Sequence, residues 1–254
     1  MPYFATAKEM ERLDALAVEN GLAIMQMMEL AGWRMAQLFA LLKIPKSAHV
    51  AILCGKGNNG GDGLSAARFL LNDGRNISVI LAETGLRADA AHHARLLKKM
   101  GVPILPFKKE TARAEIFKEH SDYENPSAVP EEAAAERFIT EADVIVDALL
   151  GYHLSGNPRR PYDRIIDLVN AASGTVISYD LPSGIDGTTG DCFEPCVRAD
   201  VTLTLALPKK AFRTRRGKEK AGRTYIGDIG IPAFLYNAIK KDSRPHFADG
   251  LCAL

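Results

Sequence analysis

A run of glycine, asparagine and aspartate residues follows a short apolar segment early in the sequence. Residues 50–54 are apolar, and Gly55-Lys56-Gly57-Asn58-Asn59-Gly60-Gly61-Asp62-Gly63 comes directly after them. Residues 64–70 then have the apolar pattern of a helix. Glycines allow a tight turn and a close approach to a ligand, and free N–H groups at a helix start attract anions. A strand, a glycine-rich loop and a helix in this order predict a site for a phosphate-bearing ligand.

Two later apolar segments each end on an aspartate. Residues 143–147 end at Asp147 and residues 175–180 end at Asp180, and both segments have the composition of strands. Ligands of a doubly wound sheet bind outside the carboxyl ends of its strands, so we expect both carboxylates and the glycine loop to meet in one crevice. The loop 181–190, rich in small residues, is expected at the same edge. The alternative is that each aspartate only caps the helix that follows it.

Strands and helices must alternate for such a crevice to form, and the apolar pattern indicates that they do. Thr6 and Glu9 have the spacing of a capping box before an N-terminal helix, and a wide apolar stripe predicts a second helix over residues 22–42. Further strands are predicted at residues 77–82, 102–105 and 201–206, and further helices at 88–100 and 161–172. We predict an α/β fold, a Rossmann-like three-layer α/β/α sandwich with a mostly parallel sheet and extra N-terminal helices.

Two charged segments stand outside this pattern. Residues 108–132 contain two prolines and predict a surface excursion with one short helix. Residues 209–223 are densely basic. This composition favours a solvated loop, and the alternative is a segment that reaches over the phosphates of a ligand.

The composition limits the classes of function. The chain has 254 residues, with 32 Lys and Arg against 31 Asp and Glu, and 47% hydrophobic residues. That content suits one sizeable core, so we expect a single domain over residues 1–254. The balanced charge gives no reason to expect a nucleic-acid partner. No apolar run approaches the roughly 20 residues of a membrane span, and the N-terminus does not have the pattern of a signal peptide.

The four cysteines are too few for a disulfide framework in a chain of this length, so a reducing cytoplasm is the simpler location. Cys192 and Cys196 could be considered metal ligands. Their spacing is loose, however, and no histidine or further cysteine pair completes a tetrahedral set.

The glycine loop is one of six motifs that occur in a particular order. The others are Met28-Glu29-Leu30-Ala31-Gly32, Asp147-Ala148-Leu149-Leu150-Gly151, Leu181-Pro182-Ser183-Gly184-Ile185-Asp186, Ala206-Leu207-Pro208-Lys209 and Gly227-Asp228-Ile229-Gly230-Ile231-Pro232. Together they resemble the NAD(P)H-hydrate epimerase family, also called the YjeF N-terminal domain. The resemblance implies an isomerase that interconverts the R and S epimers of hydrated NADH and NADPH (NADHX and NADPHX), which carry a hydroxyl group at C6 of the nicotinamide ring.

The resemblance also implies a set of site residues. Substrate contacts would come from Asn58, Asn59, Gly60, Gly61, Asp62, Gly151, Tyr152, His153, Leu154, Ser155, Gly156, Asn157 and Asp180. A potassium ion would be held by Asn59, Asp147 and Ser183. Amide, carboxylate and hydroxyl or carbonyl oxygens are hard donors, which suit such a cation better than they suit zinc.

Inversion at C6 requires the hydroxyl group to leave and return, or the ring to open and close. Either path needs proton transfer at oxygen, and our hypothesis is that Asp180 acts as the general acid and base. His153 could assist, although a histidine at the rim of a site is more often a bystander.

The chain departs from the family in two respects. Many members continue the Asp-Ala turn as Phe-Gly-Thr-Gly, whereas here Gly151 is followed by the bulky Tyr152 and His153. Many relatives are also fused to a dehydratase domain, for which these 254 residues have no room. We therefore expect a separate NAD(P)H-hydrate dehydratase as functional partner. We also expect a homodimer, with the apolar N-terminal helices as a plausible interface.

Two other functions are compatible with parts of the sequence. The first is a catalytically silent nucleotide-binding or dimerisation module of the same fold, but decayed site residues would then be expected, and Asn59, Asp147, Asp180 and Ser183 are all present. The second is a nicotinamide-dependent dehydrogenase. The glycine spacing permits it, but the acidic residue expected after a second strand is missing.

Overall fold

One eight-stranded sheet runs through the part of the chain that the computed structural model describes, residues 2–107, 131–247 and 249–254. The strand order is β3-β2-β1-β4-β5-β6-β7-β8, and only the pairing of β7 with β8 is antiparallel. The strands are β1 (His49–Cys54), β2 (Asn76–Leu81), β3 (Ile104–Pro106), β4 (Val144–Ala148), β5 (Thr175–Tyr179), β6 (Val201–Leu205), β7 (Arg223–Gly227) and β8 (Leu251–Ala253). The predicted mostly parallel sheet is therefore confirmed. The chain proceeds from β1 towards one edge and then from β4 towards the other, so the strand order reverses between β1 and β4.

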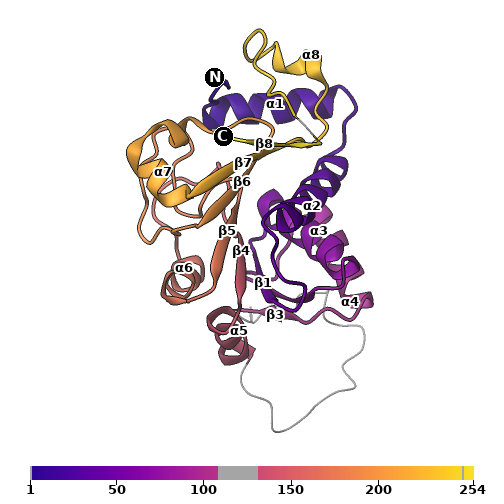
Figure 1. Ribbon diagram of the computed structural model, residues 1–254, viewed down its shortest axis with the longest axis vertical. Coiled ribbons are helices and arrows are strands. Elements are labelled where there is room, and N and C mark those ends of the chain that lie inside the picture. Colours follow the sequence, from indigo (N-terminus) through magenta and orange to yellow (C-terminus); the bar gives the residue numbers. More distant parts are fainter. Residues whose placement is uncertain (1, 108–130, 248) are drawn as a thin grey trace.

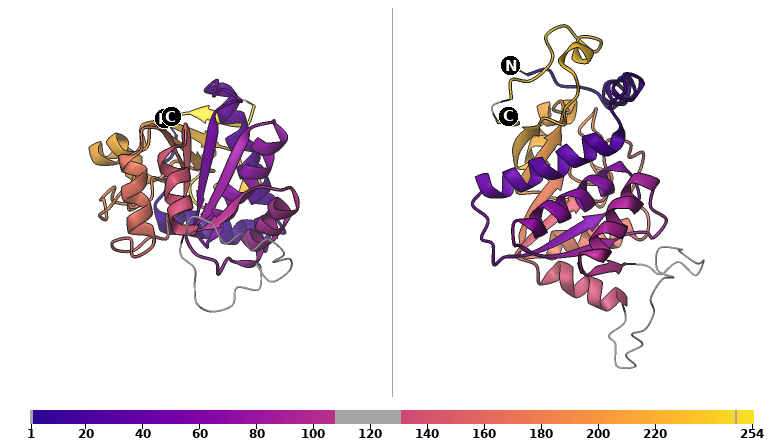
Figure 2. Two further views of the ribbon diagram at one scale, coloured as in Figure 1. Left: turned by 90° about the horizontal axis from the view of Figure 1, so that it is seen from below. Right: turned by 90° about the vertical axis from the view of Figure 1, so that its right-hand side faces the viewer.

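Helices cover both faces of this sheet (Figure 1). On one face α3 (Asn58–Asn72) packs between α2 (Ile24–Leu41) and α4 (Ala88–Lys99), and on the other lie α5 (Glu131–Thr140) and α6 (Tyr162–Ala171). Figure 2 shows α1 (Ala7–Glu19) beyond the main helical layer, next to the C-terminal segment that contains α8 (Ala233–Tyr236). The predicted three layers and extra N-terminal helix are thus present. The capping box at Thr6 and Glu9 is formed as well.

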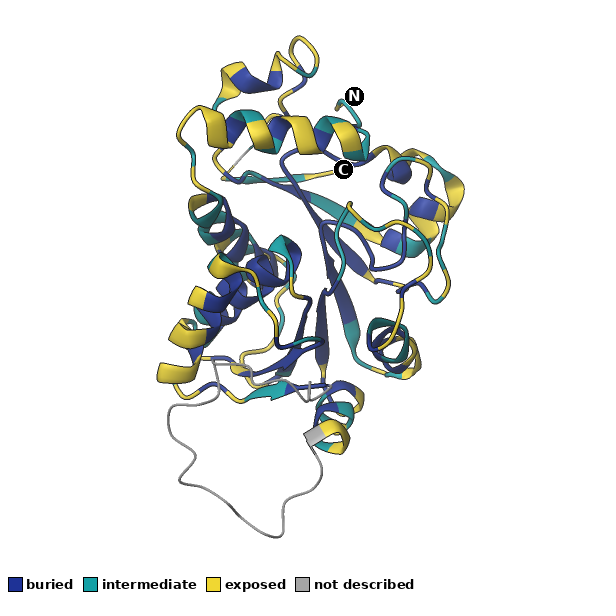
Figure 3. Cartoon of the chain, turned by 180° about the vertical axis from the view of Figure 1, so that it is seen from behind, coloured by how far each residue is buried: buried dark blue, intermediate teal, exposed yellow. Residues whose placement is uncertain are grey.

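The alternation of side chains along the central strands divides the core in two. In β1, Val50, Ile52 and Cys54 pack with the cluster under α2, α3 and α4, whereas Ala51 and Leu53 pack with the cluster under α5 and α6. All five side chains are inaccessible to solvent. Figure 3 shows the same arrangement as dark strands between helices whose outer faces are exposed. A strand covered on both faces is apolar throughout, which is why its position is readable from the sequence.

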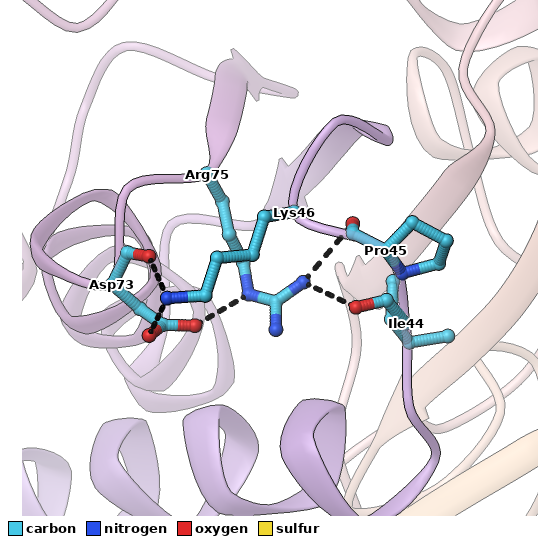
Figure 4. Close-up of polar contacts among 5 residues, drawn as sticks. All are labelled: Ile44, Pro45, Lys46, Asp73 and Arg75. Atoms are coloured by element: carbon cyan, nitrogen blue, oxygen red, sulfur yellow. Dashed lines mark hydrogen bonds and ion pairs between the residues drawn. The ribbon is translucent and has the colours of Figure 1, made fainter.

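A polar network fastens the amino-terminal pole of the sheet (Figure 4). Arg75 is almost fully buried, and its guanidinium donates to the carbonyl oxygens of Ile44 at 3.0 Å and Pro45 at 3.3 Å and to the Asp73 carboxylate at 3.0 Å. Lys46 donates to the backbone and side chain of the same aspartate, at 2.8 Å each. The connection between α2 and β1 is thereby tied to the turn after α3, so the strand and helix that position the glycine run are anchored at their far ends.

Two predicted segments differ from the structure, and four elements were not predicted. Residues 55–63 are predicted as a loop, but α3 already begins at Asn58, so the loop has three residues. Residues 209–223 are not a solvated loop: they form the 3₁₀-helix η2 (Lys210–Arg213) and α7 (Arg215–Ala221), and Lys209 is completely buried. Strands β7 and β8 and helices α5 and α8 are additions to the predicted elements.

Most of the predicted excursion over residues 108–132 lies outside the described residues. Among the described residues, none of the helices combines the length and apolar character that crossing a membrane requires.

Candidate active site

A cavity of about 1060 Å³ opens at the carboxyl ends of the strands, where the strand order reverses. It is lined by the start of α3, by the loops after β2 and β4, by the ends of β5 and β6, and by α1 and α2. The predicted crevice is therefore present at the predicted edge of the sheet. Figure 1 shows α1 beside the end of the sheet formed by β6, β7 and β8, and Met10, Asp14 and Val18 on this helix line the cavity.

Four of the five glycines of the run serve close packing rather than turning, and Gly57 is the exception. None of them has a positive φ angle. A Cβ atom on Gly60 would lie 1.8 Å from the carbonyl oxygen of Gly55, and one on Gly55 would lie 2.0 Å from that of Leu149. A Cβ on Gly63 would lie 2.7 Å from the methyl group of Ala148. The start of α3 is thus pressed against β1 and β4, which brings Asn58, Asn59 and Asp62 to the cavity.

Asp180 forms an ion pair with Lys209. Lys209 is completely buried, and its ammonium also donates to the hydroxyl of Thr204 at 3.2 Å and to the carbonyl oxygen of Leu205 at 3.0 Å. These three acceptors use all three donors of the ammonium. Asp180 is 5% exposed and additionally accepts from the backbone N–H of Leu205 at 3.2 Å. It has a φ of 61°, a left-handed conformation that few non-glycine residues adopt, and such strain is typical of functional sites.

Two further carboxyl groups, those of Asp62 and Asp14, line the same part of the cavity. Burial raises the pKa of Asp62 well above its ordinary value, and the nearby carboxylates of Asp180 and Asp14 add to the effect, while Lys209 opposes it. Burial likewise raises the pKa of Asp14, although the hydrogen bond from Tyr152 favours its charged form. We call Asp14, Asp62, Asp180 and Lys209 the buried acidic end of the cavity.

Tyr152 joins several of these groups. Its hydroxyl donates to Asp14, its ring packs on that of His153 with the centroids 4.2 Å apart, and the ammonium of Lys209 lies 5.9 Å from its centroid. The aromatic residue that departs from the family pattern therefore connects α1 to the loop after β4. His153 is exposed at the edge of the cavity.

Asp147 and Ser183 lie together beneath the cavity and do not line it. Ser183 donates to the Asp147 carboxylate from its hydroxyl at 2.6 Å and from its backbone N–H at 2.8 Å, and Ser178 donates at 2.8 Å. Burial raises the pKa of Asp147, against these hydrogen bonds. Asn59 contrasts with this pair, because both the oxygen and the nitrogen of its buried side-chain amide lack a hydrogen-bond partner in the described part of the chain.

Basic side chains line a different part of the cavity. Lys56, Arg87, Arg159 and Arg160 are exposed and follow β1, β2 and β4, whereas Asp180 and Lys209 follow β5 and β6. Lys56 lies 3.2 Å from the carboxylate of Glu83, to which the hydroxyl of Tyr162 donates at 2.7 Å. We call the four cations the exposed basic rim.

The structure brings most of the predicted substrate contacts to this cavity. The predicted residues that line it are Asn58, Asn59, Asp62, Gly151, Tyr152, His153, Leu154, Ser155 and Asp180. Gly60, Gly61, Gly156 and Asn157 do not line it. Asp14 and the rim arginines are not singled out by the sequence. Lys209 is the last residue of a family motif and lies within a basic stretch, but the sequence assigns it no role in the site.

No group of three or more His, Cys, Asp or Glu side chains with the arrangement of a metal site occurs in residues 2–107, 131–247 and 249–254. Asn59, Asp147 and Ser183, which are expected to hold a potassium ion, are not such a group, because Asp147 alone among them is one of these four residue types.

An open α/β sheet with a carboxylate-rich cavity at its switch point is typical of enzymes that act on nucleotide-like ligands. The family described as YjeF-related protein N-terminus matches residues 24–211, about three quarters of the chain. The chain belongs to this family. The crystal structure of yeast ynu0, YNL200c, has the same fold, with a TM-score of 0.79 and 23% sequence identity over 99% of this chain and 100% of the yeast chain.

Named relatives fall into two groups by length. The NAD(P)H-hydrate epimerase of Rhodopirellula baltica is 32% identical over 91% of this chain and 85% of its own length. That of Dehalogenimonas lykanthroporepellens is 34% identical over 96% and 89%, respectively. The bifunctional NAD(P)H-hydrate repair enzyme Nnr of Coxiella burnetii is 31% identical over 93% of this chain, but the chain spans only 43% of that relative's length.

Proposed function

We propose that this protein is an NAD(P)H-hydrate epimerase, an isomerase that interconverts the R and S epimers of NADHX and NADPHX. Family membership and the two relatives of similar length that carry this name support the proposal. The observation that carries it is the buried pair of Asp180 and Lys209, which faces the same cavity as Asn58, Asn59 and Asp62. A catalytically silent module has no need to keep a strained, ion-paired aspartate at a ligand cavity.

The charges at the two ends of the cavity favour one orientation of a bound hydrated dinucleotide. The exposed basic rim and the N-terminus of α3 suit the phosphate groups. The buried acidic end suits the nicotinamide ring, because carboxyl groups there can exchange protons with the hydroxyl group at C6. In this arrangement Asp180 accepts the proton, with Lys209 compensating its charge and fixing its orientation.

A potassium ion is part of this proposal, with Asn59, Asp147 and Ser183 as its ligands. The residues fit such an ion in two respects. Among the described residues, the buried amide oxygen of Asn59 has no hydrogen-bond partner, and the completely buried Asp147 carboxylate accepts hydrogen bonds from neutral donors only. All of these are hard oxygen donors. When bound, the ion supplies positive charge next to Asp147 and so lowers the cost of burying that carboxylate.

The test is an epimerisation assay on purified (R)-NADHX and (R)-NADPHX, with chromatography that separates the epimers. We expect acceleration over the spontaneous rate, and a slower rate when potassium is replaced by lithium or omitted. Acceleration without any ion dependence would contradict the potassium site and leave the enzyme in place. A folded protein that binds the substrate without accelerating the reaction would instead support the silent module.

Three further expectations belong to the same proposal. The first is a homodimer, supported by Trp33 and Leu41, which are 45% and 54% exposed on α2. The second is a cytoplasmic location, supported by the four cysteines, all of which are free. The third is a separate dehydratase that consumes one of the two epimers. Light scattering of the wild type and of Trp33→Glu would test the dimer, which this substitution is expected to dissociate.

A further inference from the structure

The buried acidic end holds more carboxyl groups than cations. Asp14, Asp62 and Asp180 share one ammonium group, that of Lys209. The three donors of this ammonium are already used by Asp180, Thr204 and Leu205. Asp62 and Asp14 are therefore left without a cation of their own.

Asp62 is the less supported of these two carboxyl groups. Asp14 accepts a hydrogen bond from Tyr152, whereas the Asp62 side chain has neither a hydrogen-bond nor an ion-pair partner among the described residues. Asp62 is only 9% exposed, and that exposure is towards the cavity. A carboxyl group in this position is most stable in its neutral form, in which it retains a proton to donate.

The groups on the surrounding elements reinforce this state. Asp14 on α1 and Asp180 after β5 repel a negative charge on Asp62, and only Lys209 attracts it. Cys54 at the end of β1 has its pKa raised by burial and stays a neutral thiol. Tyr179 on β5 also stays neutral, and its hydroxyl donates to the carbonyl oxygen of Ala31 at 2.7 Å. The surroundings thus favour different roles for the two carboxyl groups. Asp62, which has no cation of its own, is suited to act as an acid, and Asp180, which is paired with Lys209, is suited to act as a base.

Resting on the proposed epimerase function, we propose that Asp62 is a catalytic residue that gives its proton to the C6 hydroxyl group, which then leaves as water. As the C6–O bond breaks, its electron pair stays on oxygen, and the ring nitrogen supplies the pair that makes C6 and nitrogen an iminium ion. Water then attacks C6 from the opposite face and gives its proton to Asp180. In the reverse direction the two carboxyl groups exchange roles, and between turnovers the proton returns through solvent.

The charge at this end favours this path over opening of the ring. Loss of the hydroxyl group places a positive charge on the ring, and the carboxylates of Asp180 and Asp14, which line this end of the cavity, stabilise a cation beside them. Ring opening would give a neutral aldehyde, which gains nothing from the surplus of carboxylates. The arrangement therefore distinguishes two mechanisms that the reaction alone leaves open.

The first experiment uses ¹⁸O-labelled water to determine whether the oxygen atom at C6 is exchanged during epimerisation. Wild-type protein converts (R)-NADPHX in water labelled with ¹⁸O, and mass spectrometry of the separated epimers measures the label at C6. We expect about one ¹⁸O atom for each epimerisation event above the spontaneous background. Inversion with the original oxygen retained would overturn the proposal. If the wild type gives no acceleration at all, the proposed epimerase function itself is wrong.

The second experiment uses Asp62→Asn, which replaces a neutral acid by a neutral group of the same shape and should therefore fold. We expect kcat to fall by about 10²–10⁴-fold while KM changes little, because the variant lacks the proton that is transferred. Asp89→Asn is the matched control, since Asp89 lies in the first turn of α4 and does not line the cavity. A kcat of Asp62→Asn within a few-fold of the control would overturn the role of Asp62.

Discussion

The two ends of the cavity carry opposite charges and differ in how firmly their side chains are held. At the buried acidic end, Lys209 is completely buried and each of its donors has an acceptor. At the exposed basic rim, Lys56, Arg87 and Arg160 each have one long contact of 3.2–3.5 Å at the surface, and Arg159 has no side-chain partner in the described ranges. A reaction needs groups fixed before the substrate arrives, whereas phosphate groups can be met by flexible cations. The difference indicates that chemistry belongs to the first region and recognition to the second.

The largest effect should come from breaking the ion pair of the buried acidic end. Asp180→Asn leaves the Lys209 ammonium buried without a compensating charge, and Lys209→Met does the reverse. We expect each to lower the free energy of unfolding by about 3–5 kcal/mol and each to lower kcat by at least about 10²-fold. Denaturant unfolding and the epimerisation assay measure the two effects.

The double variant Asp180→Asn/Lys209→Met is the control for this pair. Its loss of unfolding free energy should be clearly smaller than the sum of the two single losses, because no buried charge remains unpaired. Additive losses would mean that the ion pair does not couple the two residues, and the contrast between the two ends of the cavity would fail.

The strands and loops that position the site can be predicted from the sequence, because each has a recognisable local pattern of apolar and charged residues. Strands β1 and β4 are covered on both faces and are therefore mostly apolar. Asp147, the penultimate residue of β4, and Asp180, directly after β5, stand out because a charge is unexpected there. The reversal of strand order then brings distant loops together. A reader of the sequence can reach the crevice and Asp180 from these features alone.

The sequence does not predict that Lys209 and Asp14 belong to the site, because their positions there depend on tertiary contacts and not on a local sequence pattern. Lys209 begins a stretch of basic surface residues, and only the close approach of Asp180 and β6 makes it a buried ion. Asp14 lies on an amphipathic helix whose direction across the sheet edge is set by packing with α8. The glycine run was assigned to a loop because glycine density usually marks a turn. Here the absence of side chains instead allows α3 to contact β1 and β4 closely.

A matched pair of tyrosines provides a sharper comparison of the two ends. Tyr152 donates to the half-buried Asp14 at the acidic end, and Tyr162 donates to Glu83 at the rim. We expect Tyr152→Phe to lower the free energy of unfolding by about 1–3 kcal/mol, since Asp14 loses the one side-chain hydrogen bond that it accepts within the described part of the chain. Tyr162→Phe should cost less than about 1 kcal/mol, because Glu83 keeps its contact with Lys56. Equal losses in thermal unfolding would show that both ends are held alike.

Substitutions at the rim should change binding and leave the chemistry intact. We expect Arg87→Gln/Arg159→Gln to raise KM for NADPHX about tenfold, equivalent to about 1.4 kcal/mol, with kcat unchanged. The KM of this variant should also depend less on ionic strength, because two exposed charges are removed. Arg198→Gln, an exposed arginine that does not line the cavity, is the control. A fall in kcat without a change in KM would place the rim in the reaction and not in recognition.

The smallest effect concerns the dependence of stability on pH, which should have opposite signs at the two poles of the sheet. The pKa of Asp62 is raised by burial, so the folded protein binds this proton more tightly than the unfolded chain. Its contribution is therefore present at low pH and is lost as the pH rises through the raised pKa, by at most about 1.4 kcal/mol per pH unit. At the other pole, the hydrogen bond from Lys46 lowers the pKa of Asp73. The contribution of ionised Asp73 to stability is weaker, and it is lost as the pH falls.

Unfolding measured across pH with one variant at each pole separates these contributions. Asp62→Asn should flatten the decline in stability on the alkaline side of the ordinary carboxyl range. Asp73→Asn should affect only the acid side, and only weakly, because the Asp73 side chain is 38% exposed and its ion pair with Lys46 is screened by solvent. A decline that persists unchanged in Asp62→Asn would assign it to Asp14 or Asp147, whose pKa values are also raised by burial. In that case Asp62 would be ionised in the resting protein, and the division of acid and base between Asp62 and Asp180 would be wrong.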